Sequence, residues 1–129
     1  MNFFLFLKFS LVGLLGVGIN FLTTWLLKDF LRVKKYYSNS LGYTFAMIFN
    51  FFGNKIWTFS SNSELIYIQL LKFLFVVLIG VLLNHLIVFY FHDKIKINFY
   101  ISKLLAVAIV FIWNFFMHTY FTFNYFKYF

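Results

Sequence analysis

Long apolar stretches alternate with short polar ones along most of this chain. Four apolar stretches carry few charged side chains, and aromatic residues extend the second and the fourth; they are residues 9–27, 37–52, 73–91 and 101–116. Each can reach the roughly 20 residues that an α-helix needs to cross about 30 Å of hydrocarbon. The pattern therefore predicts an all-α integral membrane protein with four transmembrane helices.

Four such helices would use most of the chain, so residues 1–129 are expected to form a single membrane domain. The composition supports this class, because 64% of the residues are hydrophobic and none is proline, whereas soluble domains are about half apolar. The first stretch follows only "MNFFLFLK" and has no small-residue cleavage site. It is therefore expected to be a retained helix rather than a signal peptide.

The same sequence pattern occurs twice, at a fixed offset of 64 residues. "KFSLVGLLGVGINFL" from Lys8 aligns with "KFLFVVLIGVLLNHL" from Lys72, and the offset continues without a gap to Thr58 and Thr122. Matches of Phe and Leu mean little in this composition, but the Lys, Gly, Asn, Asp and Thr matches are informative. We therefore expect a tandem repeat of two helical hairpins, at about 7–60 and 71–124. Two spans per copy make the repeat parallel, with its axis along the membrane normal.

Four asparagines interrupt the apolar stretches, namely Asn20, Asn50, Asn84 and Asn114. A buried amide without a partner costs a few kcal/mol in hydrocarbon, so these side chains should face another helix or a wet cavity. Two interpretations stay open at this point. The amides either bridge helices by hydrogen bonds worth about 1 kcal/mol each, or they line the path of a polar ligand.

The densest polar motif is "NFFGNKIWTF" at 50–59, which recurs in altered form as "NFFMHTYFTF" at 114–123. At α-helical spacing Asn50, Asn54 and Trp57 share one face, with Lys55 beside them. The corresponding face of the second copy carries Asn114, His118 and Phe121. An amide, a cation and an indole are thus predicted to converge at headgroup depth. The simpler alternative is an interfacial anchor, with Trp in the aromatic belt and Lys reaching the lipid phosphates.

The charge and the missing chemistry exclude several functions. The net charge of +8 comes from lysines that flank the apolar stretches, which is typical of topology signals and anionic-lipid contacts rather than nucleic-acid binding. The absence of cysteine and of clustered carboxylates argues against a metal site. No phosphate-binding Gly-rich loop and no acid pair or nucleophile–base pair is present. The sequence thus predicts a protein that is not an enzyme, uses no cofactor and is not driven by ATP.

The order of "KFSLVGLLGVGINF", "NFFGNKIWTF" and a second copy of both resembles the GtrA-like family of small four-span membrane proteins. The resemblance covers about residues 6–124, and its most specific residues are Asn50, Phe51, Asn54, Lys55, Trp57, Thr58 and Phe59. It implies a flippase, or a flippase subunit, that moves a polyprenyl-phosphate-linked monosaccharide across the cytoplasmic membrane for cell-surface polysaccharide or glycan modification. The second copy departs from the family pattern at Met117, His118, Thr119 and Phe121.

The chemistry of such a substrate agrees with the motif. A lipid-linked sugar phosphate presents an anionic phosphate, hydroxyl groups and a sugar face, which call for a cation, amides and an aromatic plane. The expected substrate-binding residues are Asn50, Asn54, Lys55, Trp57, Asn20, Asn84, Asn114, His118, Lys8 and Lys72. A lone imidazole such as that of His118 is more often a satisfied polar group than a ligand.

A thin four-helix bundle leaves little room for a sugar phosphate headgroup. We therefore expect a homodimer, or a complex with a membrane glycosyltransferase, with a path along an interface lined by Asn20, Asn50, Asn84 or Asn114. Two other functions stay open, a membrane anchor or partner subunit of a glycosyltransferase and a small pore or holin-like protein. The orientation is also open. The positive-inside rule places the loops within the two hairpins in the cytoplasm, whereas the family resemblance implies that both termini are cytoplasmic.

Overall fold

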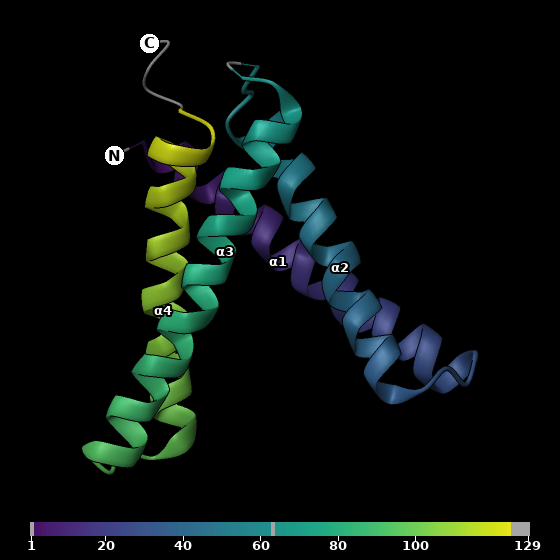
Figure 1. The fold of residues 1–129 in the computed structure, drawn as a ribbon, viewed down its shortest axis with the longest axis vertical. Helices are drawn as coiled ribbons and strands as arrows, with labels where there is room; N and C mark the ends of the chain where they lie inside the picture. Colours follow the sequence, from purple (N-terminus) through teal and green to yellow (C-terminus); the bar gives the residue numbers. More distant parts are fainter. Residues whose placement is uncertain (1, 63, 125–129) are drawn as a thin grey trace. The chain divides into compact units, whose positions relative to one another are not determined.

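The chain folds as two compact units, Met1–Ser60 and Ser61–Phe129. The computed structural model describes residues 2–62 and 64–124, and every regular element in these residues is helical. Unit 1 contains α1 (Phe3–Trp25) and α2 (Lys35–Gly53), and unit 2 contains α3 (Ile66–Val88) and α4 (Phe99–Met117). Within each unit the two helices pack side by side as a hairpin (Figure 1).

Every α-helix continues into a short π-helical segment. These segments are η1 (Leu26–Phe30), η2 (Asn54–Thr58), η3 (Phe89–Lys94) and η4 (His118–Thr122). The backbone then leaves the helix through a residue with positive φ, at Arg32 (59°), Ser60 (47°), Lys96 (67°) and Asn124 (47°). A left-handed residue at this place ends a helix, because the chain direction changes while the last carbonyl groups keep partners.

Each α-helix begins before the apolar stretch from which it was predicted. Asn2 caps α1, since its Oδ1 accepts hydrogen bonds from the backbone N–H groups of Phe4 (3.0 Å) and Leu5 (3.3 Å). Asn98 caps α4 in the same way through the N–H of Tyr100 at 2.9 Å. Such caps satisfy N–H groups that have no partner inside the helix. As a result, Lys8 lies within α1 rather than ahead of it.

Three helical segments of the described chain are long and apolar enough to cross a membrane, namely Phe3–Phe30, Ile66–Lys94 and Phe99–Thr122. The protein is therefore an all-helical integral membrane protein. Helix α2 is not in this set, because its first half carries polar residues such as Ser38, Asn39 and Ser40. The fourth span that the apolar pattern suggested at 37–52 stays a prediction.

Small residues set the closest approach within unit 1. Ser38, Gly42 and Ala46 of α2 are buried and repeat every four residues, which places them on one face of the helix. A Cβ built on Gly42 would lie 2.7 Å from the backbone oxygen of Asn20, closer than real Cβ atoms come. The glycine therefore allows the backbones of α1 and α2 to meet, as small residues do in membrane helix pairs.

We predict that Gly42→Ala lowers the stability of the protein by about 1–3 kcal/mol, because α1 and α2 must separate to admit the methyl group. Thermal unfolding of the purified protein in nanodiscs, followed by circular dichroism, measures the effect.

The matched control is Gly13→Ala, since a Cβ at Gly13 would meet no atom within 4 Å among the described residues, apart from its own stretch of α1. Alanine favours the helix by about 0.5–1 kcal/mol over glycine, so this variant should be at least as stable as the wild type. Equal behaviour of the two variants would show that Gly42 does not limit the packing.

Candidate functional site

At the end of unit 1 where α1 begins, a cation and an indole from opposite ends of the unit's sequence come together. The Nζ of Lys8 in α1 lies 5.5 Å from the centroid of the Trp57 ring and donates a hydrogen bond to the backbone oxygen of Trp57 at 3.4 Å. An ammonium at this distance from an indole face is attracted to it. Lys8 and Trp57, both expected site residues, therefore lie side by side, and Lys55 is half-buried in the same η2 segment.

A row of polar side chains follows at four-residue spacing along α2 and η2. Asn50 Oδ1, Asn54 Oδ1 and Thr58 Oγ1 are all buried, and none of them has a hydrogen-bond partner in the described part of the chain. Asn54 and Thr58 are each only 3% exposed. A buried polar atom without a partner costs about 1–3 kcal/mol, so these oxygens would gain from a ligand or a protein that brings hydrogen-bond donors.

The sequence predicted that Asn50, Asn54 and Trp57 share one face of a helix, and this prediction is wrong for Trp57. Asn54–Thr58 is π-helical, with the N–H of Phe59 bonded to the oxygen of Asn54 at 2.8 Å. A π-turn contains more residues than an α-turn, so Thr58 faces inward and Trp57 is 46% exposed. Thr58 is thus a candidate site residue that the helical periodicity missed, although its spacing of four from Asn54 was a visible signal.

Glycine makes room for the amide that lies deepest in each hairpin. A Cβ on Gly16 of α1 would lie 2.8 Å from Nδ2 of Asn50, and a Cβ on Gly80 of α3 would lie 3.2 Å from Oδ1 of Asn114. Asn114 Oδ1, like that of Asn50, is buried without a hydrogen-bond partner among the described residues. Asn50 and Asn114 therefore contact the first helix of their own unit, as expected for polar groups that avoid lipid.

In unit 2 the lysine that corresponds to Lys8 has a carboxylate partner. Lys72 Nζ lies 5.3 Å from the ring of Phe121, but it also forms an ion pair of 2.7 Å with Glu64 Oε1. Glu64 accepts a second hydrogen bond, from Asn124 Nδ2 at 3.0 Å. Among the residues that the structure describes, Lys8 forms no salt bridge. Lys8 is therefore better placed than Lys72 to bind an added anion.

His118 packs in the interior of unit 2. It is 2% exposed, its ring stacks on Phe73 with centroids 4.7 Å apart, and its Nδ1 lies 2.9 Å from Thr122 Oγ1. The expected site residue His118 thus has partners on its ring face and its edge, whereas Asn54 at the corresponding place in unit 1 keeps an oxygen without one. The two hairpins share a layout but differ in how their polar groups are satisfied.

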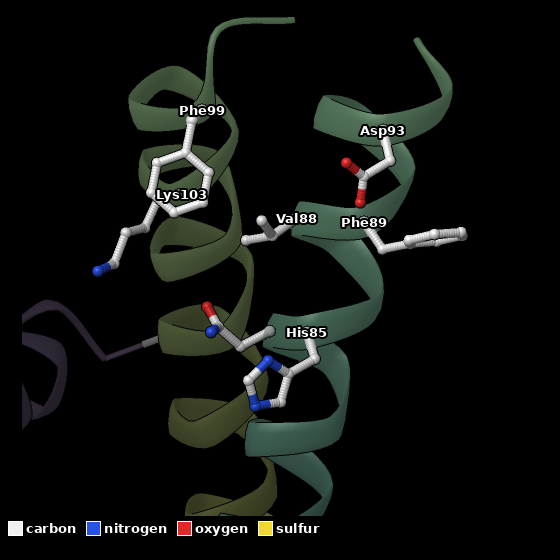
Figure 2. Close-up of a pocket in the computed structure, with 7 residues that line it drawn as sticks. His85, Val88, Phe89, Asp93, Phe99 and Lys103 are labelled. Atoms are coloured by element: carbon white, nitrogen blue, oxygen red, sulfur yellow. The ribbon is translucent and has the colours of Figure 1, made fainter. Parts of the chain in front are cut away.

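The two remaining asparagines lie toward the loop within each hairpin. Thr24 Oγ1 is 3.4 Å from both Asn20 Oδ1 and the backbone oxygen of Ser38, so the hydroxyl can donate to either. Asn84 lines a pocket near the end of α3 (Figure 2). The expected site residues are therefore distributed over both ends of the helices. No group of three or more His, Cys, Asp or Glu side chains gathers for a metal within residues 2–62 and 64–124.

The family model described as "GtrA/DPMS, transmembrane domain" matches residues 8–123, which is nearly the whole chain. None of the curated proteins matched the sequence.

We predict that Glu64→Gln destabilises the protein by about 1–2 kcal/mol, because it weakens two hydrogen bonds to a partly shielded carboxylate. The side chains of Lys72 and Glu64 are only 24% and 22% exposed. The control is Asp29→Asn, whose ion pair with Lys28 is long, at 3.8 Å, and about half exposed; a change below about 0.5 kcal/mol is expected there. Chemical denaturation in mild detergent measures both, and a larger loss for Asp29→Asn would contradict this assignment.

Proposed function

Because the chain belongs to the GtrA/DPMS transmembrane-domain family, we propose that it is a flippase, or a flippase subunit, for a polyprenyl-phosphate-linked monosaccharide. Family membership supports an integral membrane protein that associates with lipid and takes part in handling lipid-linked sugars. In the proposed role the protein acts without catalysis. It moves the sugar across the cytoplasmic membrane, where the sugar is then used to modify a cell-surface polysaccharide or glycan.

One observation carries the proposal. The Lys8–Trp57 contact lies next to a row of buried oxygens in α2 and η2 that have no hydrogen-bond partner in the described residues. Lys8 supplies an ammonium without a carboxylate partner in the described residues, and this suits a phosphate. The indole of Trp57 offers an exposed aromatic plane for a sugar face. Asn50, Asn54 and Thr58 offer oxygens that can accept hydrogen bonds from sugar hydroxyls.

The row also suggests how a sugar enters the bilayer. From Thr58 to Asn50 the helix rises by about 12 Å, at roughly 1.5 Å per residue. Each step of four residues presents another acceptor, so hydroxyl groups that leave water can exchange one partner for the next. A lost hydrogen bond costs about 1–3 kcal/mol in a buried site, and successive acceptors reduce this cost along the path. The polyprenyl chain stays in lipid throughout.

The proposal includes four spans in a tandem parallel repeat. Helix α2 has 19 residues and η2 adds 5, which is enough to cross about 30 Å of hydrocarbon. Part of its lower hydropathy has a cause in the packing, because Ser38, Gly42 and Ala46 are buried against α1. The repeat is supported by corresponding contacts in the two units, Gly16 with Asn50 and Gly80 with Asn114.

Reconstituted translocation tests the function and compares the two units. Purified protein is placed in vesicles that contain a short-chain polyprenyl phosphate hexose, and a membrane-impermeant oxidant reports which sugars have moved. We predict that Trp57→Ala lowers the rate about tenfold or more, because the plane that contacts the sugar and Lys8 is lost. Phe121→Ala, which removes the corresponding ring beside Lys72, should lower it far less.

Equal losses from the two variants would contradict the assignment of the headgroup site to unit 1. Full transport by the double variant Lys55→Ala, Trp57→Ala would favour the alternative role of an anchor or partner subunit of a glycosyltransferase. Leakage of a small dye from the vesicles would instead favour a pore. His118→Ala is a poor comparison, because it removes a ring that is stacked in the interior of unit 2.

We predict that the transporting species is a homodimer or a complex with a membrane glycosyltransferase, because one hairpin pair encloses little space for a headgroup. A path along an interface lined by Asn20, Asn50, Asn84 or Asn114 can open sideways to admit the polyprenyl chain. Mass measurement in mild detergent and crosslinking in native membranes test this. Transport by a species that is monomeric in both experiments would overturn the prediction.

A further inference from the structure

Unit 2 contains a pocket at the end of α3, far along the helix from Lys72. Its volume is about 350 Å³, and it is lined by Asn84, His85, Val88, Phe89, Asp93, Phe99 and Lys103. Sites for small molecules have volumes of about 300–1,000 Å³. From Lys72 to Asp93 the helix rises by roughly 30 Å at about 1.5 Å per residue, so the pocket lies one hydrocarbon thickness away from the Lys72–Phe121 contact.

Two substitutions between the repeats explain why this end of unit 2 differs from unit 1. Val88 stands where unit 1 has Thr24, so the hydroxyl that can donate to Asn20 has no counterpart next to Asn84. Ala106, which is fully buried, stands where unit 1 has Gly42, the residue that lets the two backbones meet. Asn84 consequently makes no side-chain hydrogen bond within the described residues, and its amide is available to a ligand in the pocket.

The connection between α3 and α4 forms a fixed wall for the pocket. His92 Nδ1 donates a hydrogen bond of 2.9 Å to the backbone oxygen of Ile97, and its ring meets Phe99 edge to face at 5.4 Å. Asn98 caps α4 directly before Phe99. These contacts hold Phe99 against the pocket without any ligand, so the site is formed in advance.

The chemistry of the lining suits a phosphorylated sugar. The Asn84 amide, the His85 imidazole and the Asp93 carboxylate can each bond to hydroxyl groups, and Lys103 provides a cation for phosphate. Figure 2 shows Val88 and Asp93 pointing from α3 and η3 toward α4, whereas the Lys103 side chain extends from α4 away from α3. Hydrogen-bonding groups, an aromatic ring and a lysine therefore line one small cavity.

We propose that this pocket is a second binding site for the sugar phosphate headgroup, at the membrane face where α3 ends and α4 begins. The proposal rests on the function proposed above, since a lipid-linked sugar that crosses the bilayer needs hydrogen-bond partners at both faces. Unit 2 supplies these partners at this face through Asn84, Asp93 and Lys103. Phe99 and Val88 exclude water from the apolar side of the bound sugar.

Photolabelling in nanodiscs tests the site independently of transport. The probe is a short-chain polyprenyl phosphate hexose that carries a diazirine on the sugar, prepared with glucose, mannose and N-acetylglucosamine. Mass spectrometry is expected to find label on residues 84–103, and excess unlabelled lipid-linked sugar should displace it. Asn84→Leu with Val88→Phe, which fills the pocket, should reduce this label about tenfold, as expected from the loss of roughly 1.4 kcal/mol of binding.

Leu104→Phe is the control for added bulk, because Leu104 is 69% exposed and does not line the pocket. Lys103→Gln provides a second test at an exposed side chain, and it should weaken labelling by the phosphate-bearing probe. Label on 84–103 that survives both pocket variants, or label confined to unit 1, overturns the proposal. Pocket labelling without translocation would contradict the proposed function but support the second binding site. Translocation without pocket labelling would support the proposed function but contradict the second site.

Discussion

The contact between a small, polar stripe on the second helix of each hairpin and the first helix governs the rest of this structure. In unit 1 the stripe repeats every four residues, from Ser38 through Gly42 and Ala46 to Asn50 and Asn54. Inside a bilayer the hydrophobic effect does not drive helices together, so close packing and inward polar groups must do so. The stripe supplies both, and it leaves large apolar side chains of α2 such as Phe45 and Ile48 exposed for lipid.

The apolar pattern and the polar matches at one offset were enough to predict a helical membrane protein, and the residues at 50–59 pointed to the family. The sequence was less informative about α2, because the polar residues that lower its hydropathy include both the buried Ser38 and the exposed Asn39 and Ser40. Hydropathy averages a helix over all its faces and therefore cannot separate an inward polar stripe from an exposed one.

The site was only partly predictable. Lys8 and Trp57 were predicted as separate site residues, and the structure places them in contact. An α-helical period places both Trp57 and Thr58 near the face of Asn54, and the π-helical hydrogen bonds decide that Thr58 is the buried one. The pairing of Lys72 with Glu64 was equally hidden, since it depends on how the segment before α3 folds back. The first depends on the local backbone geometry of η2 and the second on tertiary geometry.

The π-helical segment at the end of each hairpin also limits how the protein can evolve. In η2 one turn holds an additional residue, and this residue determines which of Trp57 and Thr58 faces the interior. Loss of one residue from Asn54–Thr58 would restore an α-turn and rotate the following side chains by about 100° relative to Asn50. Changes of chain length are therefore more restricted here than changes of residue type.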